Sequence, residues 1–232
     1  MIDVERLLDN ASVITLRKRP DRGASFLSRW QTLTGASCRI VYGFDGSRFP
    51  IPEKWRTSSG AFGCCLAHVF AQARILSDAE YDDETPFFIM EDDAVFCDGF
   101  LEKLKALAPF VPDDYDVLYL GGEHLIGGRR APKRVAEGVV RAYNVNRLHA
   151  YVATARALKK IFPRLLAYAT NAPQFYGPSG DETCFDYEVG RMTEEGVLTV
   201  YAASPFLVGQ GGFGSDTYPG KASDTHLTRF WN

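Results

Sequence analysis

The stretch PFFIMEDD, residues 86–93, decides how this chain folds. Five apolar residues with the length of a buried β-strand are followed directly by three carboxylates. Alternation along a strand places Glu91 and Asp93 on one face and Asp92 on the other. Carboxylates gathered in this way repel one another unless a cation or hydrogen bonds compensate. Such oxygen ligands suit Mg²⁺ or Mn²⁺ bound with help from phosphates, whereas a solvated acidic turn is the alternative interpretation.

Similar apolar runs flank this stretch and alternate with helical patterns. Strands are expected over residues 12–16, 38–44 and 115–120, and helices over residues 22–33, from about residue 60 to 76, and over residues 100–107. This order predicts βαβ units and an α/β fold whose central sheet is mixed, mostly parallel and flanked by helices. Ligands of such sheets bind beyond the carboxyl ends of the strands. The residues just after Leu16, Phe44, Met90 and Leu120 therefore become candidates for a site.

The second half of the chain is less regular. Strands are expected over residues 139–143, 151–154 and 197–202, and helices over residues 155–167, interrupted at Pro163, and 181–195. Residues 125–134 and 171–180 have loop composition, and residues 209–232 form a Gly-rich tail. We expect one domain with two halves, residues 1–122 and 123–232.

Composition excludes several classes of protein. The chain has 232 residues, 46% of them hydrophobic, and a net charge of -3, which argues against disorder and against a nucleic-acid partner. The five cysteines are an odd number without CxxC spacing, which favours a reducing compartment. No apolar run approaches the roughly 20 residues of a membrane span, and the acidic start does not resemble a signal peptide. These features predict a cytoplasmic protein without integral membrane contact.

A basic cluster follows the first expected strand. Arg17, Lys18, Arg19 and Arg22 lie at the predicted ligand edge, where they would contact a phosphate or nucleotide. The alternative is a solvated helix start with Pro20 in its first turn.

Two further groups are open to both a functional and a structural interpretation. His68 lies opposite the expected apolar face of its helix, which includes Leu66 and Val69, and is either a ligand or a structural histidine. The neighbouring Cys64 and Cys65 are interpreted as residues that fill the core. Asp181 and Glu182 open the later helix, where one of them is a general base or both belong to a helix-capping motif.

Several segments together resemble a known family. VITLRKRPDR (13–22), FDG (44–46), GAFGCCLAHVF (60–70) and FFIMEDDAVF (87–96) resemble the glycosyltransferase 25 family, the lipopolysaccharide-type and collagen-type galactosyltransferases. LHAYVATARALKKI (148–161) and SPFLVGQGGFGSDT (204–217) are similar to later segments of that family in the same order. The family usually has Asn where Thr15 stands and Ser where Ala67 stands.

The resemblance implies a GT-A fold and the transfer of a sugar, often galactose, from a UDP-sugar to an acceptor hydroxyl on a glycan, glycolipid or glycoprotein, with inversion. It implies that Asp93, together with Glu91, binds Mn²⁺ or Mg²⁺, and that Asp181, or Glu182, deprotonates the acceptor. The donor site that it implies comprises Thr15, Leu16, Arg17, Arg19, Arg22, Asp45, Gly63, His68, Glu91 and Asp92.

Other functions fit the same residues. Clustered carboxylates on an α/β sheet also serve nucleotidyltransferases and phosphoesterases. A catalytically inactive module that binds a nucleotide or a sugar is a third interpretation, in line with Thr15 and Ala67.

Overall fold

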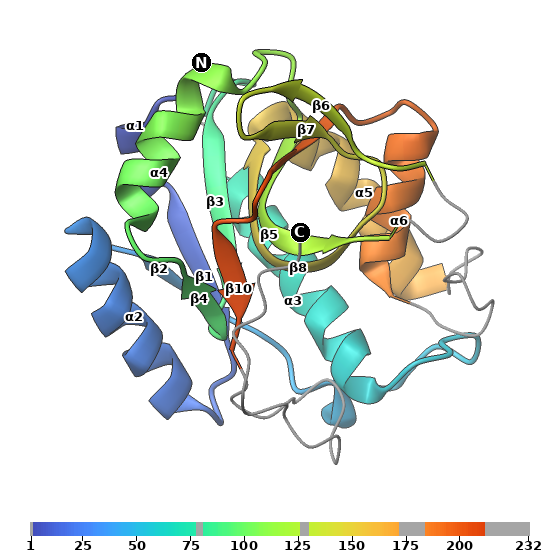
Figure 1. The fold of residues 1–232 in the computed structure, drawn as a ribbon. Coiled ribbons are helices and arrows are strands. Elements are labelled where there is room, and N and C mark those ends of the chain that lie inside the picture. Colours follow the sequence, from blue (N-terminus) through green and yellow to red (C-terminus); the bar gives the residue numbers. More distant parts are fainter. Residues whose placement is uncertain (1, 78–80, 126–129, 172–183, 212–232) are drawn as a thin grey trace.

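A mixed eight-stranded sheet, in the order β2-β1-β3-β8-β5-β9-β7-β6, forms the centre of the protein (Figure 1). The structure is a computed structural model that describes residues 2–77, 81–125, 130–171 and 184–211. The pairings make β2, β1, β3, β5, β9 and β6 run in one direction and β8 and β7 in the other. The expected α/β class with a mixed, mostly parallel central sheet is confirmed.

The strands and helices have the following bounds. The strands are β1 Ala11–Thr15, β2 Arg39–Tyr42, β3 Pro86–Glu91, β4 Ala94–Phe96, β5 Val117–His124, β6 Lys133–Ala136, β7 Val139–Arg141, β8 Val145–Thr154, β9 Val200–Ala203 and β10 Val208–Gln210, the last paired with β4. The helices are α1 Val4–Asp9, α2 Pro20–Thr34, α3 Ser59–Leu76, α4 Phe100–Leu107, α5 Ala155–Asn171 and α6 Phe185–Glu194, with short 3₁₀ turns at Gly46–Arg48 and Ala108–Phe110.

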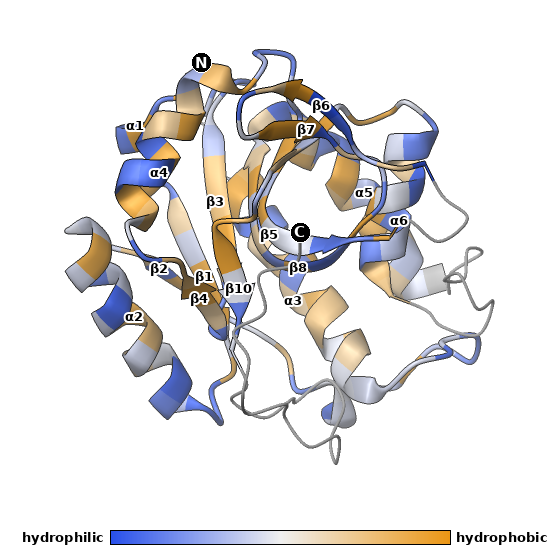
Figure 2. Ribbon diagram, viewed as in Figure 1, coloured by the Kyte–Doolittle hydropathy of each residue, from blue (hydrophilic) through white to orange (hydrophobic). Residues whose placement is uncertain are grey.

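Helices cover both faces of the sheet, and the sheet separates two apolar cores. Along β3, Phe87 and Ile89 belong to the core under α3, α5 and α6, whereas Phe88 and Met90 belong to the core under α1, α2 and α4. Figure 2 shows apolar residues concentrated on the sheet and on the helix faces that meet it. The uninterrupted apolar run of β3 follows from this burial on both faces.

Most differences from the expected elements lie in the second half of the chain. β5 continues through Gly121 and Gly122, which were expected to end it, because side chains of β8 fill the space beside both glycines. A Cβ atom on Gly121 would lie 2.4 Å from His149 Nε2, and one on Gly122 would lie 2.4 Å from Val145 Cγ1. α5 runs through Pro163 without the expected interruption. Its buried apolar residues hold both halves of the helix against the core.

Other elements also begin at residues different from those expected. β8 begins at Val145, six residues before the expected strand, because it pairs along its length with β3 and β5. Part of the expected 125–134 loop forms the start of β6, and α6 begins at Phe185. Three short elements, α1, β4 and β10, had no expected counterpart.

The burial of α3 corrects the expected orientation of His68. Cys65, His68 and Gln72 are at most 1% exposed, whereas Leu66 is only partly buried. α3 packs against both the sheet and α5, so its polar residues also face protein. His68 therefore lies in the interior and not on the outer side of the helix.

The first turn of α3 packs closely against the loop that follows β2. A Cβ atom on Gly63 would lie 2.4 Å from the Phe44 carbonyl oxygen, and one on Gly46 would lie 1.7 Å from the Ser59 carbonyl oxygen. Only glycine leaves room for two backbones to approach this closely. This contact fixes the loop at one wall of the site described next.

Candidate functional site

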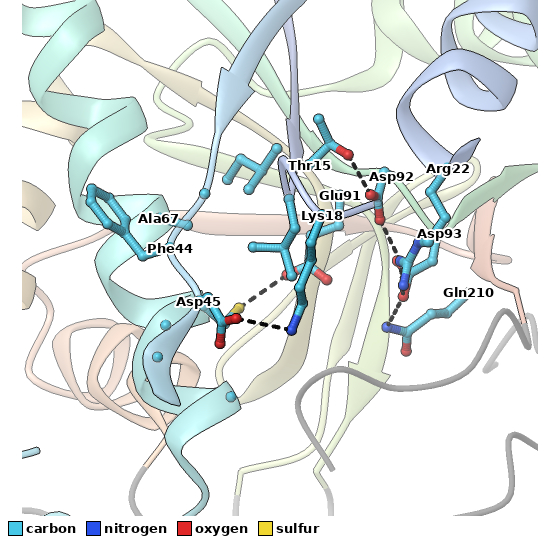
Figure 3. A pocket seen from close by; sticks show the side chains of 17 residues that line it. Thr15, Lys18, Arg22, Phe44, Asp45, Ala67, Glu91, Asp92, Asp93 and Gln210 are labelled. Carbon is cyan, nitrogen blue, oxygen red and sulfur yellow. Dashed lines mark hydrogen bonds and ion pairs between the residues drawn. The ribbon is translucent and has the colours of Figure 1, made fainter. Parts of the chain in front are cut away.

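A pocket lies where β1, β2 and β3 reach their carboxyl ends, at the edge predicted from the sequence (Figure 3). β1 and the loop after it supply one wall, and the loop after β2 and the first half of α3 supply another. The acidic residues at and just after the end of β3 supply the third. Its lining consists of Ile14, Thr15, Leu16, Lys18, Arg22, Gly43, Phe44, Asp45, Gly46, Gly60, Gly63, Cys64, Ala67, Glu91, Asp92, Asp93 and Gln210.

Arg22 on α2 connects two of the three carboxylates. Its guanidinium forms an ion pair with Asp92 and lies 3.4 Å from Asp93 Oδ2. Thr15 Oγ1 donates a 2.6 Å hydrogen bond to the other oxygen of Asp92. Burial raises the pKa of Asp92, and the charge of Arg22 and the bond from Thr15 oppose that shift. Asp92 is therefore held in place by protein groups on both of its oxygens.

Asp93 is the carboxylate with capacity left for a ligand. Gln210 Nε2 donates a 3.1 Å hydrogen bond to Oδ2, while buried Oδ1 has no hydrogen-bond partner within the described parts of the chain. Burial, followed by the negative charge of Glu91, raises the pKa of Asp93 to about 7. A buried carboxylate oxygen without a partner is costly, and a bound cation would remove that cost. The donor set at Asp93 therefore fits a hard divalent cation.

Glu91 turns toward α3. Its Oε1 lies 3.2 Å from His68 Nε2 and accepts a 3.4 Å hydrogen bond from the thiol of Cys64. Burial alone would raise the pKa of Glu91, but the hydrogen bond and charge of His68 outweigh burial and lower it. Burial, reinforced by Glu91, raises the pKa of Cys64 well above its usual value.

The expected alternation of the three carboxylates was wrong in one respect. Asp92 does lie on the opposite face from Glu91, because it pairs with Arg22 on α2 whereas Glu91 contacts Cys64 and His68 on α3. Asp93 was expected on the face of Glu91, yet its Oδ2 lies 3.4 Å from Arg22. The strand ends at Glu91 and the chain turns at Asp92 and Asp93 before β4 begins, so period-two geometry no longer applies there.

Most predicted donor-site residues do meet in the pocket, and three do not. Thr15, Leu16, Arg22, Asp45, Gly63, Glu91, Asp92 and Asp93 line it. Arg17 instead lies over the ring of Tyr42, 4.0 Å from its centre, and Arg19 pairs with Asp21. His68 lies behind Glu91, where it is fully buried. Asp181 and Glu182 lie outside the described residues.

Two further groups of the site were not among the predicted donor-site residues. Lys18 was placed at the ligand edge with the neighbouring arginines, and in the pocket it forms a 3.3 Å ion pair with Asp45 (Figure 3). Gln210 belongs to a segment with little periodicity that reaches the pocket through the pairing of β10 with β4. The only sequence signal for Gln210 was its place in the 204–217 segment.

The fold and the site define an α/β protein with an acidic ligand pocket at the carboxyl edge of its sheet. Arg22, Lys18 and the partnerless oxygen of Asp93 give that pocket both positive groups and a cation ligand. Such a combination suits a ligand that carries phosphate groups together with a metal ion. Within the described residues, no helix combines the length and the apolar character needed to cross a bilayer.

Comparison with known sequences adds a relative. The chain is 25% identical over 176 residues to the procollagen lysyl hydroxylase and glycosyltransferase of Acanthamoeba polyphaga mimivirus, a match that includes 66% of this chain. The chain spans about a fifth (19%) of that relative's length. No protein-family model matches. This similarity to a protein whose name includes a glycosyltransferase agrees with part of the expected resemblance.

Comparison with solved structures gives weaker similarities. A glycosyltransferase involved in glycosylation of the major capsid of PBCV-1 aligns with 84% of this chain and 92% of its own, at 10% identity and a TM-score of 0.39. The inositol-1-phosphate CTP transferase of T. maritima aligns with 83% of this chain and 64% of its own, at 13% identity and a TM-score of 0.37. Mouse xyloside xylosyltransferase 1 aligns with 86% of this chain and 69% of its own, at 9% identity and a TM-score of 0.33. At these TM-scores the functions of the three proteins carry no weight for this chain.

Proposed function

We propose that this chain is a metal-dependent, inverting glycosyltransferase of the family 25 type, with a GT-A fold. It moves a hexose, galactose or a close relative, from a UDP-sugar to an acceptor hydroxyl. The observation that carries the proposal is the partly buried Asp93, whose buried Oδ1 has no hydrogen-bond partner within the described residues, in a pocket at the strand ends. The 176-residue similarity to a protein named as a procollagen lysyl hydroxylase and glycosyltransferase supports a glycosyltransferase activity.

Asp93 would hold Mn²⁺ or Mg²⁺ through its partnerless oxygen. When bound, the cation supplies Lewis-acid stabilisation of the negative charge that grows on the departing diphosphate. Arg22 and Lys18, which also line the pocket, would add positive charge beside the same phosphates. Asp92, fixed by Thr15 and Arg22, holds the wall in shape.

Inversion takes place in a single displacement and needs a base on the acceptor side. We assign this role to Asp181, with Glu182 as the neighbouring alternative. General-base assistance is worth roughly 10²–10⁴-fold in rate. The acceptor belongs to the residue 123–232 half in this scheme, and its class is a hydroxyl on a glycan, glycolipid or glycoprotein. A hydroxyl on a protein is in line with the procollagen named for the mimivirus relative.

The experiment is a thermal-shift and calorimetric panel of nucleotides on the full chain. UDP, UDP-galactose, UDP-glucose, CTP and GDP-mannose are each tested with Mn²⁺, with Mg²⁺ and with a chelator. Binding to the native state raises the melting temperature. We expect the uridine diphosphates to bind only with metal and at least one UDP-sugar to be turned over.

Two other results have distinct meanings. Turnover of CTP with a phosphorylated acceptor would replace the proposal with a nucleotidyltransferase. Metal-dependent binding of UDP without turnover of any donor in the presence of sugar, lipid and peptide acceptors would identify an inactive binding module. Absence of uridine nucleotide binding under every condition contradicts the proposal.

A further inference from the structure

A cluster of three metal-ligating side chains lies in the wall of the pocket, apart from Asp93. Cys64 Sγ, His68 Nε2 and Glu91 Oε1 all lie within 4.8 Å of one another. We propose that they form an open, three-ligand site for a zinc-class cation. The inference does not rest on the proposed glycosyltransferase activity.

The separations of the ligand atoms match a tetrahedral site. Sulfur and oxygen are 3.4 Å apart, and nitrogen and oxygen are 3.2 Å apart. With Zn–S near 2.3 Å and Zn–N and Zn–O near 2.0–2.2 Å, tetrahedral angles place such atoms about 3.3–3.6 Å apart. Two of the three edges are therefore already close to the length that zinc requires.

The local structure explains why these side chains converge. Cys64 and His68 are separated by four positions on α3, so both project from the same side of the helix. The same spacing places paired histidines of helical zinc motifs on one metal. Glu91 arrives from the end of β3, on the sheet that α3 covers. A helix and a strand thus fix the three ligands independently of any loop.

His68 has the outer partner that a metal-bound histidine requires. Its Nδ1 lies 3.2 Å from the hydroxyl of Tyr151, whose ring stacks beside the imidazole. A hydrogen bond to the second ring nitrogen fixes the tautomer and leaves Nε2 as the ligand. Phe185 also packs against the imidazole of His68, with the two ring centres 4.8 Å apart. These contacts hold the imidazole in the orientation that faces Cys64 and Glu91.

The chemistry selects zinc over magnesium or manganese, because a thiolate is a soft ligand. Binding breaks the S–H bond of Cys64, forms a metal–sulfur bond and releases one proton to solvent, with no change in oxidation state. Cys64 and Glu91 both line the pocket, so the fourth coordination position lies on the pocket side. Three protein ligands and one open position are typical of catalytic and not of structural zinc sites. An anionic oxygen of a pocket ligand is the group that this position would take.

The test measures Zn²⁺ and Co²⁺ binding to the full, metal-stripped chain without nucleotide. We expect one equivalent of Zn²⁺ that a large excess of Mg²⁺ does not displace, and a thiolate-to-cobalt charge-transfer band with Co²⁺. Cys64→Ser keeps a hydrogen-bond donor for Glu91 but removes the thiolate. We expect it to abolish the band and weaken Zn²⁺ binding by more than about 100-fold, beyond the loss typical of an outer-shell change.

Cys97→Ser is the matched control, because Cys97 is partly buried and packs against the core on the opposite face of the sheet. It should keep the band and the affinity. Absence of the charge-transfer band in the unmodified chain overturns the proposal without recourse to any variant. Equal Zn²⁺ affinity of Cys64→Ser and the unmodified chain overturns it as well. Failure of the chain to bind uridine nucleotides would not affect the zinc proposal and would count only against the proposed function.

Discussion

The guanidinium of Arg22 on α2 lies 3.4 Å from Asp93 Oδ2, and this ion pair joins the helix to the turn after β3. The same guanidinium also pairs with Asp92, and the Arg22 side chain is only 9% exposed. One positive charge is thus shared by two carboxylates, of which Asp92 is buried and Asp93 is partly buried. This arrangement leaves negative charge in the pocket for a cation to balance.

Asp93→Asn should separate ligand binding from folding. The amide keeps the shape of the side chain and a partner for Gln210 but removes the negative charge that a cation needs. We expect metal-dependent binding of UDP to weaken by at least about 10-fold while the melting temperature stays within a few degrees. Calorimetric titration with UDP and Mn²⁺ provides the measurement. Asp9→Asn, at an exposed position of α1, is the control, and unchanged UDP binding by Asp93→Asn would remove Asp93 as the ligand.

Arg22→Gln should destabilise the fold. Removing one member of a buried ion pair leaves its partner uncompensated, which typically costs about 3–5 kcal/mol. Denaturant unfolding near neutral pH measures this loss. Arg19→Gln removes a guanidinium whose partner, Asp21, is largely exposed, and we expect no measurable change from it. Equal stabilities of the two variants would mean that the shared ion pair contributes nothing to folding.

Gly63→Ala tests the close packing of α3 against the loop after β2. Alanine favours a helix, so the isolated helix would gain stability, yet its Cβ would lie 2.4 Å from the Phe44 carbonyl oxygen. We expect a net loss of about 1–3 kcal/mol in the free energy of unfolding, together with weaker ligand binding. Gly23→Ala on α2, whose Cβ would lie no closer than 3.2 Å to its nearest neighbour, the Thr15 side chain, should cost less. A stabilised Gly63→Ala variant contradicts the packing described.

His149 should make stability depend on pH. Burial lowers its pKa to about 4, with the Val208 carbonyl only partly opposing that shift, whereas an unfolded histidine titrates near 6.5. Between these values the unfolded state binds the extra proton, so stability contributed by neutral His149 is complete above about pH 6.5 and falls toward pH 4. The loss amounts to about 3 kcal/mol.

His149→Gln keeps a donor for the Val208 carbonyl but does not titrate. Denaturant unfolding of both proteins from pH 7.5 to 4 gives the comparison. We expect the difference in stability to shift in favour of the glutamine variant as the pH falls. Parallel stability curves would exclude His149 as the source.

Asp181→Asn should abolish sugar transfer but leave binding of the donor unchanged. Removal of a general base costs roughly 10²–10⁴-fold in rate, while Mn²⁺-dependent UDP binding is unaffected. Transfer from a UDP-sugar and UDP titration are the paired measurements. Glu182→Gln is compared directly, and normal transfer by Asp181→Asn with loss in Glu182→Gln would move the role to Glu182.

The sequence by itself determined the first half of the sheet and the place of the site. The apolar run at β3 is buried on both faces, so its hydrophobicity has no gap, and its carboxylates follow within the same segment. The helical spacing of Phe26 and Trp30 likewise identified α2. These patterns are local in the sequence, and the elements that they predict form because their apolar residues are buried in the structure.

Only the tertiary structure decided which neighbouring residues enter the pocket and which turn away. Arg17 and Arg19 adjoin Arg22 in sequence, yet one stacks on Tyr42 and the other pairs with Asp21. Gln210 reaches Asp93 through pairing between β10 and β4, which short periodic patterns do not encode. His68 and Cys64 meet Glu91 because α3 lies directly over the end of β3. Side-chain direction at a strand end depends on the turn and on partners distant in the chain, and a sequence pattern contains neither.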